Sequence, residues 1–163
     1  MDISCSNIVY SVTDRATGKS VALLNDISLQ IKANEFVCLI GPSGSGKTTL
    51  LNILSGRNRP TKGQVAIDGA DLFQNFSALK KRIAFVPQRD ILYETLSPKE
   101  GLTYTAKLRL PLDTNYQSVV NQTLRMVGLT GQAATRVANL SGGQRKRACL
   151  GNEILSKPDV LFL

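Results

Sequence analysis

One segment of eight residues restricts the possible folds of this chain more than any other. The stretch GPSGSGKT at 41–48 matches the pattern G-x-x-x-x-G-K-[ST] at all of its fixed positions. The segment 35–40 precedes it, and its apolar run FVCLI is typical of a strand buried on both faces of a parallel sheet. The residues KTTLLNIL at 47–54 have helical character, and Gly56 suits a helix C-terminus. The sequence therefore predicts a strand, a glycine loop and a helix within an α/β fold.

The chemistry of this loop favours a nucleoside triphosphate with Mg²⁺. Its glycines let successive N–H groups face inward, and the following helix adds about half an elementary positive charge at its N-terminus. Lys47 can neutralise the β- and γ-phosphates, and the Thr48 hydroxyl can bind the bridging Mg²⁺. The alternative is a glycine-rich turn with an incidental lysine, but such a turn would not require a strand before it and a helix after it. The loop alone does not identify the class of protein, because GTPases and kinases share it. The expected nucleotide contacts are Gly41, Ser43, Gly44, Ser45, Gly46, Lys47, Thr48 and Thr49.

The rest of the chain predicts short strands and three further helices. Ser97, Pro98 and Glu100 provide an N-cap, a first-turn proline and a capping carboxylate, which together indicate a helix start. A second helix follows from apolar spacing over 119–127, with Gly128 to close it, and Ser141 opens a third. The predicted strands cover 64–69, with an Asp-Gly turn at its end, 82–88 and 160–163.

Composition indicates a globular chain without a membrane span. Its 163 residues are 42% hydrophobic and 20% charged, which is ordinary for one folded domain. The longest apolar runs fall far short of the roughly 20 residues that a spanning helix needs. The N-terminal stretch MDISCSNIVY has no basic flank before an apolar segment, so no secretory signal is expected.

The cysteines and the net charge leave the function open. Cys5, Cys38 and Cys149 lie far apart and lack the close spacing of a zinc site or a disulfide framework, so we expect reduced thiols, two of them in the core. A formal charge of +8 is compatible with a nucleic acid or an anionic membrane surface as partner. Composition cannot choose between them.

A second motif, LSGGQ at 140–144, decides the family. Taken alone it predicts only a capping box, with Ser141 as N-cap and Gln144 at the third helical position. Far downstream of a complete P-loop, with a helical insert between, it resembles the signature sequence of the ATP-binding cassette (ABC) family. The resemblance implies ATP and Mg²⁺ as cofactors and a head-to-tail dimer with a second nucleotide-binding domain. In that dimer the residues facing the partner's ATP would be Ser141, Gly142, Gly143 and Gln144.

Further positions take expected roles from this resemblance. Gln88, between the two motifs, matches the Q-loop glutamine that contacts Mg²⁺ in the family, the alternative being a plain surface turn. Val12 aligns with an adenine-stacking aromatic of many members, and Tyr10 lies two residues earlier, where a buried strand residue is the alternative role. Catalytic groups in this chain would be limited to Lys47 and Gln88. We expect the basic residues at 145–147 to form a solvated helix face, or alternatively to contact a phosphate or a partner.

The resemblance covers the whole chain and implies its architecture. The expected fold is that of a P-loop NTPase, an ABC-type ATPase with a parallel core sheet, an N-terminal antiparallel β subdomain and a helical insert. Residues 1–163 would form one incomplete ATP-binding domain, with a helical subdomain at about 90–138. The stretches LLNDIS, GKTTLLNILSGR and LSGGQRKRACLGNEILSKPDVLFL are similar to the white or eye-pigment (G) subfamily of half-transporters. That subfamily implies transmembrane domains downstream and a place at the cytoplasmic face of a membrane.

The last residues bear on catalysis. In the family, four apolar residues of the Walker B strand precede an Asp and a Glu, and VLFL at 160–163 provides only the four. We therefore expect a transport ATPase in which this chain alone hydrolyses little ATP. A soluble ABC ATPase of the DNA-repair, chromosome or translation type is one alternative, although no specific nucleic acid is expected. A module that uses ATP only as a dimerisation ligand is another.

Overall fold

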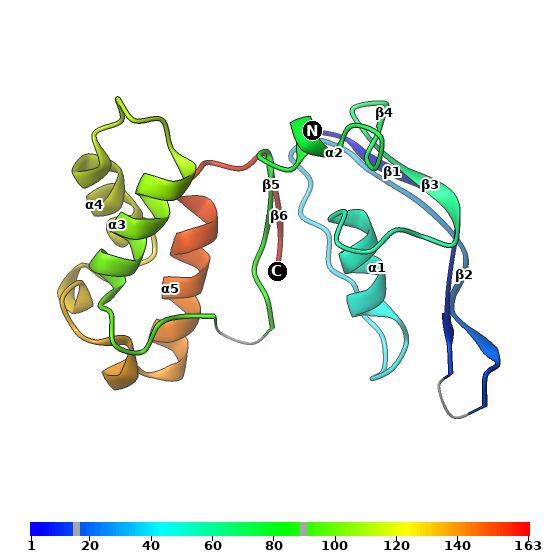
Figure 1. Cartoon of the computed structure of the whole chain (residues 1–163), viewed down its shortest axis with the longest axis horizontal. Helices are drawn as coiled ribbons and strands as arrows, with labels where there is room; N and C mark the ends of the chain where they lie inside the picture. Colours follow the sequence, from blue (N-terminus) through cyan, green and yellow to red (C-terminus); the bar gives the residue numbers. More distant parts are fainter. Residues whose placement is uncertain (15–16, 89–90) are drawn as a thin grey trace. The chain divides into compact units, whose positions relative to one another are not determined.

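The computed structural model describes residues 1–14, 17–88 and 91–163, and these divide into two compact units (Figure 1). Unit 1 comprises Met1–Lys80 and unit 2 comprises Lys81–Leu163. Unit 1 holds the glycine loop, and unit 2 holds the helices expected between the two motifs. Two boundaries stay predictions: those of the expected domain, 1–163, and those of its helical subdomain, about 90–138.

Unit 1 is built on a four-stranded antiparallel sheet in the order β2-β1-β3-β4. The long pair β1–β2 runs from Ile3 opposite Ile31 to Thr13 opposite Ser20. Val65 and Ile67 alternate inward and are fully buried, as expected for a sheet with one covered face. The expected N-terminal antiparallel β structure is therefore confirmed. Its strands are β1 (Ile3–Thr13), β2 (Ser20–Ile31), β3 (Lys62–Ile67) and β4 (Ala70–Asp71).

The turn from β3 to β4 forms where the sequence predicts it. Asp68 and Gly69 have φ angles of 49° and 80°, the positive values that a two-residue hairpin turn requires. The Asp68 side chain also accepts a hydrogen bond from the Asp2 amide at 2.8 Å. This contact joins the turn to the start of β1.

The predicted strand at 35–40 is wrong for this structure. These residues have no regular secondary structure, and Phe36 and Ile40 are 90% and 91% exposed. A strand exists only where a neighbouring strand accepts and donates its backbone hydrogen bonds. The strands described in unit 1 pair with one another and with no part of 35–40. The apolar sequence of 35–40 is typical of a buried strand, but no strand described in unit 1 pairs with it.

The helix after the glycine loop is confirmed. Helix α1 (Lys47–Leu54) buries Leu50, Ile53 and Leu54, which recur at the spacing of one helical face. Gly56 follows with φ 78°, the left-handed value expected at a helix C-terminus. The α1 helix contacts β2, and a short helix, α2 (Phe76–Leu79), completes unit 1.

Three helices of unit 2 enclose its hydrophobic core (Figure 1). They are α3 (Pro98–Arg109), α4 (Tyr116–Met126) and α5 (Gly142–Ile154), with 3₁₀ turns η1 (Thr130–Gln132) and η2 (Val137–Asn139). All three predicted helices are thereby confirmed. The buried core consists of Leu102, Ala106, Val120, Leu124, Val127, Leu129, Ala148 and Leu155.

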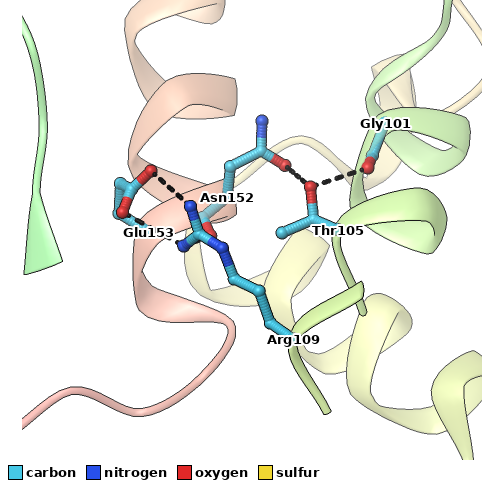
Figure 2. A network of polar contacts seen from close by, with 5 residues as sticks. All are labelled: Gly101, Thr105, Arg109, Asn152 and Glu153. Atoms are coloured by element: carbon cyan, nitrogen blue, oxygen red, sulfur yellow. Dashed lines mark hydrogen bonds and ion pairs between the residues drawn. The ribbon is translucent and has the colours of Figure 1, made fainter. Parts of the chain in front are cut away.

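A polar network also joins α3 to α5 (Figure 2). The Thr105 hydroxyl lies 3.0 Å from Asn152 Oδ1 and 3.0 Å from the Gly101 carbonyl oxygen, and its single proton is shared between these two acceptors. Arg109 binds both carboxylate oxygens of Glu153, at 3.1 and 3.2 Å, and the Asn152 carbonyl at 3.1 Å. Two-point guanidinium–carboxylate contacts restrict geometry more than single ones. The network therefore helps to set the orientation of α5.

A parallel pair of strands, β5 (Ile83–Phe85) and β6 (Val160–Phe162), forms the sheet described in unit 2. The Val86 amide extends the pairing by donating to the Phe162 carbonyl at 2.8 Å. Phe85 and Phe162 stack with ring centroids 6.5 Å apart. The pair is shorter than the predicted strands at 82–88 and 160–163, and it is the parallel part of the expected mixed α/β fold.

The cysteines lie as the sequence predicts. Cys5 and Cys149 are buried, Cys38 is exposed, and none of the three forms a disulfide. Burial raises the pKa of Cys5. Within 1–14, 17–88 and 91–163, no helix has both the length and the apolarity needed to cross a membrane.

The helix start at Ser97 carries a prediction for pH dependence. The backbone amide and the hydroxyl of Ser97 donate to the Glu100 carboxylate, at 2.8 and 2.7 Å, and lower its pKa. A carboxyl whose pKa is lower in the folded than in the unfolded state stabilises the fold above its unfolded pKa of about 4.3. That contribution is lost as the pH falls through the folded value.

Glu100→Gln should therefore destabilise the protein more at pH 7 than at acid pH. The measurement is urea unfolding of both proteins from pH 7 down to about pH 3.5, below the ordinary glutamate pKa. The difference in unfolding free energy should shrink at the acid end. A difference that stays constant across this range would contradict the assignment.

Candidate nucleotide-binding site

The glycine loop in unit 1 has a backbone that other residues adopt only with strain. Gly44 and Gly46 have φ angles of 81° and 87°, and Gly46 is the N-cap of α1. A Cβ on Gly46 would lie 2.7 Å from Leu24 Cδ2 and 3.1 Å from the Leu23 carbonyl oxygen. The glycine at position 46 is thus required both by its φ and by the approach of β2.

The Lys47 ammonium group closes over the loop. It donates hydrogen bonds to the carbonyl oxygens of Gly41 and Pro42, at 2.8 and 2.7 Å, and to Ser45 Oγ at 3.3 Å. These contacts keep a positive charge against the loop backbone, as in a site built for an anion. Phosphate oxygens are stronger acceptors than carbonyls because they are charged. A bound phosphate could therefore take over these hydrogen bonds.

The N-terminus of α1 adds positive potential at the same place. Its N-cap, Gly46, has no side chain and makes no capping hydrogen bond, so the first-turn N–H groups lack a side-chain partner there. Thr48 is exposed and Thr49 is half-buried at this helix start. The geometry fits a phosphate group, for which helix N-termini provide both N–H donors and a favourable dipole.

The two candidate adenine contacts differ in their surroundings. Tyr10 is half-buried, and its hydroxyl accepts a hydrogen bond from Asn58 Nδ2 at 3.4 Å. Val12 is 37% exposed and pairs with Val21 of β2. The Asn58 contact joins the Tyr10 side chain to the segment that follows α1, whereas Val12 presents an apolar surface. Both assignments stay predictions.

In unit 2, the LSGGQ segment forms the capping box that its sequence predicts. Ser141 Oγ accepts from the Gln144 amide at 3.3 Å, and Gln144 Oε1 accepts from the Ser141 amide at 2.8 Å. Gly142 and Gly143 are exposed, and a Cβ added to either would meet nothing within 4 Å. The start of α5 is therefore a helix N-terminus with open space around two glycines.

A family comparison decides what these two motifs belong to. The model of the family described as "ABC transporter" matches residues 24–163, which include both the glycine loop and LSGGQ. This chain belongs to the ABC transporter family. Its resemblance to the G subfamily is confirmed as well, since G family members are among its relatives.

Two relatives show how much of an ABC protein this chain spans. It is 40% identical over 144 residues to an ABC transporter ATP-binding/permease protein of Mycobacterium tuberculosis, covering 86% of this chain and 17% of that protein. It is 38% identical over 143 residues to ABC transporter G family member 4 of Arabidopsis thaliana, covering 86% of this chain and 24% of that protein. The chain therefore spans about a fifth of the length of these relatives.

A solved ABC cassette has the same fold. This dimeric ATP-binding cassette, in a post-hydrolysis state with ADP and Pi, aligns with a TM-score of 0.84 at 26% sequence identity. The alignment covers 98% of this chain and 72% of that one. The P-loop NTPase fold expected for an ABC ATPase is thus confirmed.

The basic residues after the ABC signature differ from expectation. They do not simply form a solvated helix face, because each donates to backbone carbonyls of other segments in unit 2. No sequence pattern indicated these contacts, since the acceptors are main-chain atoms, and those of Lys146 and Arg147 lie 19 to 59 positions away. The contacts are Arg145 to Ala138 and Leu140, Lys146 to Pro87 and Gln88, and Arg147 to Val127 and Gly128.

Proposed function

We propose that this chain is the Mg-ATP-binding portion of an ABC transporter ATPase. The observation that carries the proposal is the glycine loop, where the Lys47 ammonium is held by three loop oxygens beside the uncapped N-terminus of α1. Family membership supports ATP over other nucleotides. The solved cassette of the same fold contains ADP and Pi.

Mg²⁺ would need few protein ligands at this site. The ABC resemblance implies two oxygen donors for it, the hydroxyl of Thr48 in unit 1 and the side-chain amide of Gln88 in unit 2, and both residues are exposed. Among the residues that the structure describes, no group of three or more His, Cys, Asp or Glu could hold a metal ion. Mg²⁺ bound with a nucleotide usually keeps several waters and takes phosphate oxygens as ligands. When bound, the ion would neutralise charge between the β- and γ-phosphates.

A second nucleotide-binding domain, head to tail, is the partner that we propose for LSGGQ. Ser141, Gly142, Gly143 and Gln144 would face the γ-phosphate held by that partner's P-loop. The open helix N-terminus at Gly142 and Gly143 supports this role, since it can bind an anion but has no base to activate water. The solved cassette of the same fold is dimeric.

ATP binding and hydrolysis in the whole protein would drive transport across a membrane. ATP would close the dimer and hydrolysis would reopen it, moving transmembrane domains coupled to it. A relative that combines ATP-binding and permease parts supports such domains. This portion would lie at the cytoplasmic face of the membrane. Export is the direction of transport that we propose.

Replacing Lys47 with alanine tests the phosphate assignment. We expect Lys47→Ala to weaken Mg-ATP binding about tenfold or more, since charge-assisted hydrogen bonds are each worth about 1.5–3 kcal/mol. Isothermal titration calorimetry would measure the dissociation constant for both proteins. Lys107→Ala, an exposed lysine of α3, is the matched control and should bind like the wild type. Unchanged affinity in Lys47→Ala would overturn the assignment.

A further inference from the structure

The segment that follows β5 is held from its carbonyl side by one lysine. Regular pairing of β5 with β6 ends at Val86, whose amide donates to Phe162. Pro87, which has no N–H to donate, comes next. The Lys146 ammonium donates to the Pro87 carbonyl at 3.2 Å and to the Gln88 carbonyl at 2.7 Å. Lys146 thus provides hydrogen bonds where the strand pairing stops.

The same lysine lies on the helix that begins with the ABC signature. Lys146 is in the second turn of α5, five residues after the N-cap Ser141. The α5 helix packs against β5. Arg147, the residue after Lys146 in α5, donates to the carbonyls of Val127 and Gly128 at the end of α4. These contacts fix α5 against β5 and against the end of α4. The position of the Gln88 backbone is therefore tied to that of the LSGGQ helix.

We propose that Lys146 is a positioning residue that holds the backbone of Gln88 against α5, so that the Gln88 side chain is placed for Mg-ATP. This inference rests on the proposed function, because it assigns Gln88 to the nucleotide. Lys146 itself would touch neither phosphate nor Mg²⁺. Its charge acts on two carbonyl oxygens, a contact stronger than a neutral hydrogen bond.

Two variants separate the hydrogen bonds from the bulk of the side chain. Lys146→Met keeps a side chain of similar length but cannot donate, and Lys146→Arg can still donate to two carbonyls. Lys107→Met on α3 is the control for loss of one exposed lysine. Thermal melting of each variant checks that the fold is retained, as expected for an exposed residue.

Hydrogen exchange and nucleotide affinity are the two readouts. In nucleotide-free protein, Lys146→Met should exchange about tenfold faster over 83–88, whereas Lys146→Arg and Lys107→Met should match the wild type. Its affinity for Mg-ATP should fall about tenfold, as on loss of a group that orients a metal contact, with affinity for ATP in EDTA unchanged. A purely structural loss would change both affinities together.

Each other outcome has a distinct meaning. Unchanged exchange over 83–88 in Lys146→Met would overturn the proposal, and so would faster exchange with unchanged Mg-ATP affinity. If Lys47→Ala binds Mg-ATP like the wild type, the proposed function fails. The exchange data on nucleotide-free protein would still show whether Lys146 holds the segment.

Discussion

Replacing Gly63 with alanine is expected to lower the free energy of unfolding by about 3 kcal/mol or more, from combined backbone strain and steric overlap. Gly63 has φ 84°, and a Cβ there would lie 2.4 Å from the carbonyl oxygens of both Ser6 and Asn7. These are backbone atoms of β1, opposite the place where the β1–β3 register shifts between Ser6 and Val9. Relief would therefore require separating two paired strands.

Gly69→Ala is the matched control for Gly63→Ala. Gly69 has a similar φ of 80°, but a Cβ there would meet nothing within 4 Å. Its substitution should cost only the conformational strain of about 1–2 kcal/mol. Urea unfolding followed by circular dichroism would measure both variants. Equal destabilisation by the two substitutions would show that the contact with β1 is not the cause.

Leu102→Ala is the second change with a large expected effect. Leu102 is 1% exposed in the core that α3, α4 and α5 share. Its side chain lies against Gly151 of α5, where an added Cβ would be 3.4 Å from Leu102 Cδ2. Truncating a buried leucine typically costs about 2–5 kcal/mol, because transfer energy is lost and a cavity remains. We expect about 3 kcal/mol here, the middle of that range.

Leu108, on the same helix, provides the control for Leu102. It is 86% exposed, so Leu108→Ala should change the free energy of unfolding by no more than about 0.5 kcal/mol. Urea unfolding measures both, and limited proteolysis would show whether unit 2 opens more easily in Leu102→Ala. Since α5 carries LSGGQ at its start, such opening would also disturb the signature segment. A similar effect of both substitutions would contradict the core assignment.

Local sequence patterns predicted much of the fold and of the candidate site. Both capping boxes, at Ser97 and Ser141, form as expected because their donors and acceptors lie within four residues of each other. The hairpin turn at Asp68 and Gly69 and the end of α1 at Gly56 follow from backbone conformations that few residues tolerate. Pattern matching located the glycine loop and the ABC signature because each motif is a short run of adjacent residues.

Tertiary contacts explain what the patterns missed. The segment 35–40 has a strand-like sequence but forms none, because strand pairing depends on a neighbour rather than on its own residues. The contacts of 145–147 were missed because a run of basic residues looks the same whether it faces solvent or carbonyl oxygens. An adenine contact by Tyr10 or Val12 stays a prediction, and the structure adds that Asn58 donates a hydrogen bond to the Tyr10 hydroxyl.

By itself, the sequence determined the glycine loop, the helix starts, the turns and the ABC family, since each depends on residues close together in the chain. Only the tertiary structure showed that Lys47 rests on the loop's own carbonyls and that Lys146 binds Gln88, 58 positions away. The physical reason is that a long, flexible cationic side chain can reach many acceptors. Which acceptors it meets depends on how distant segments pack, and no local pattern records that.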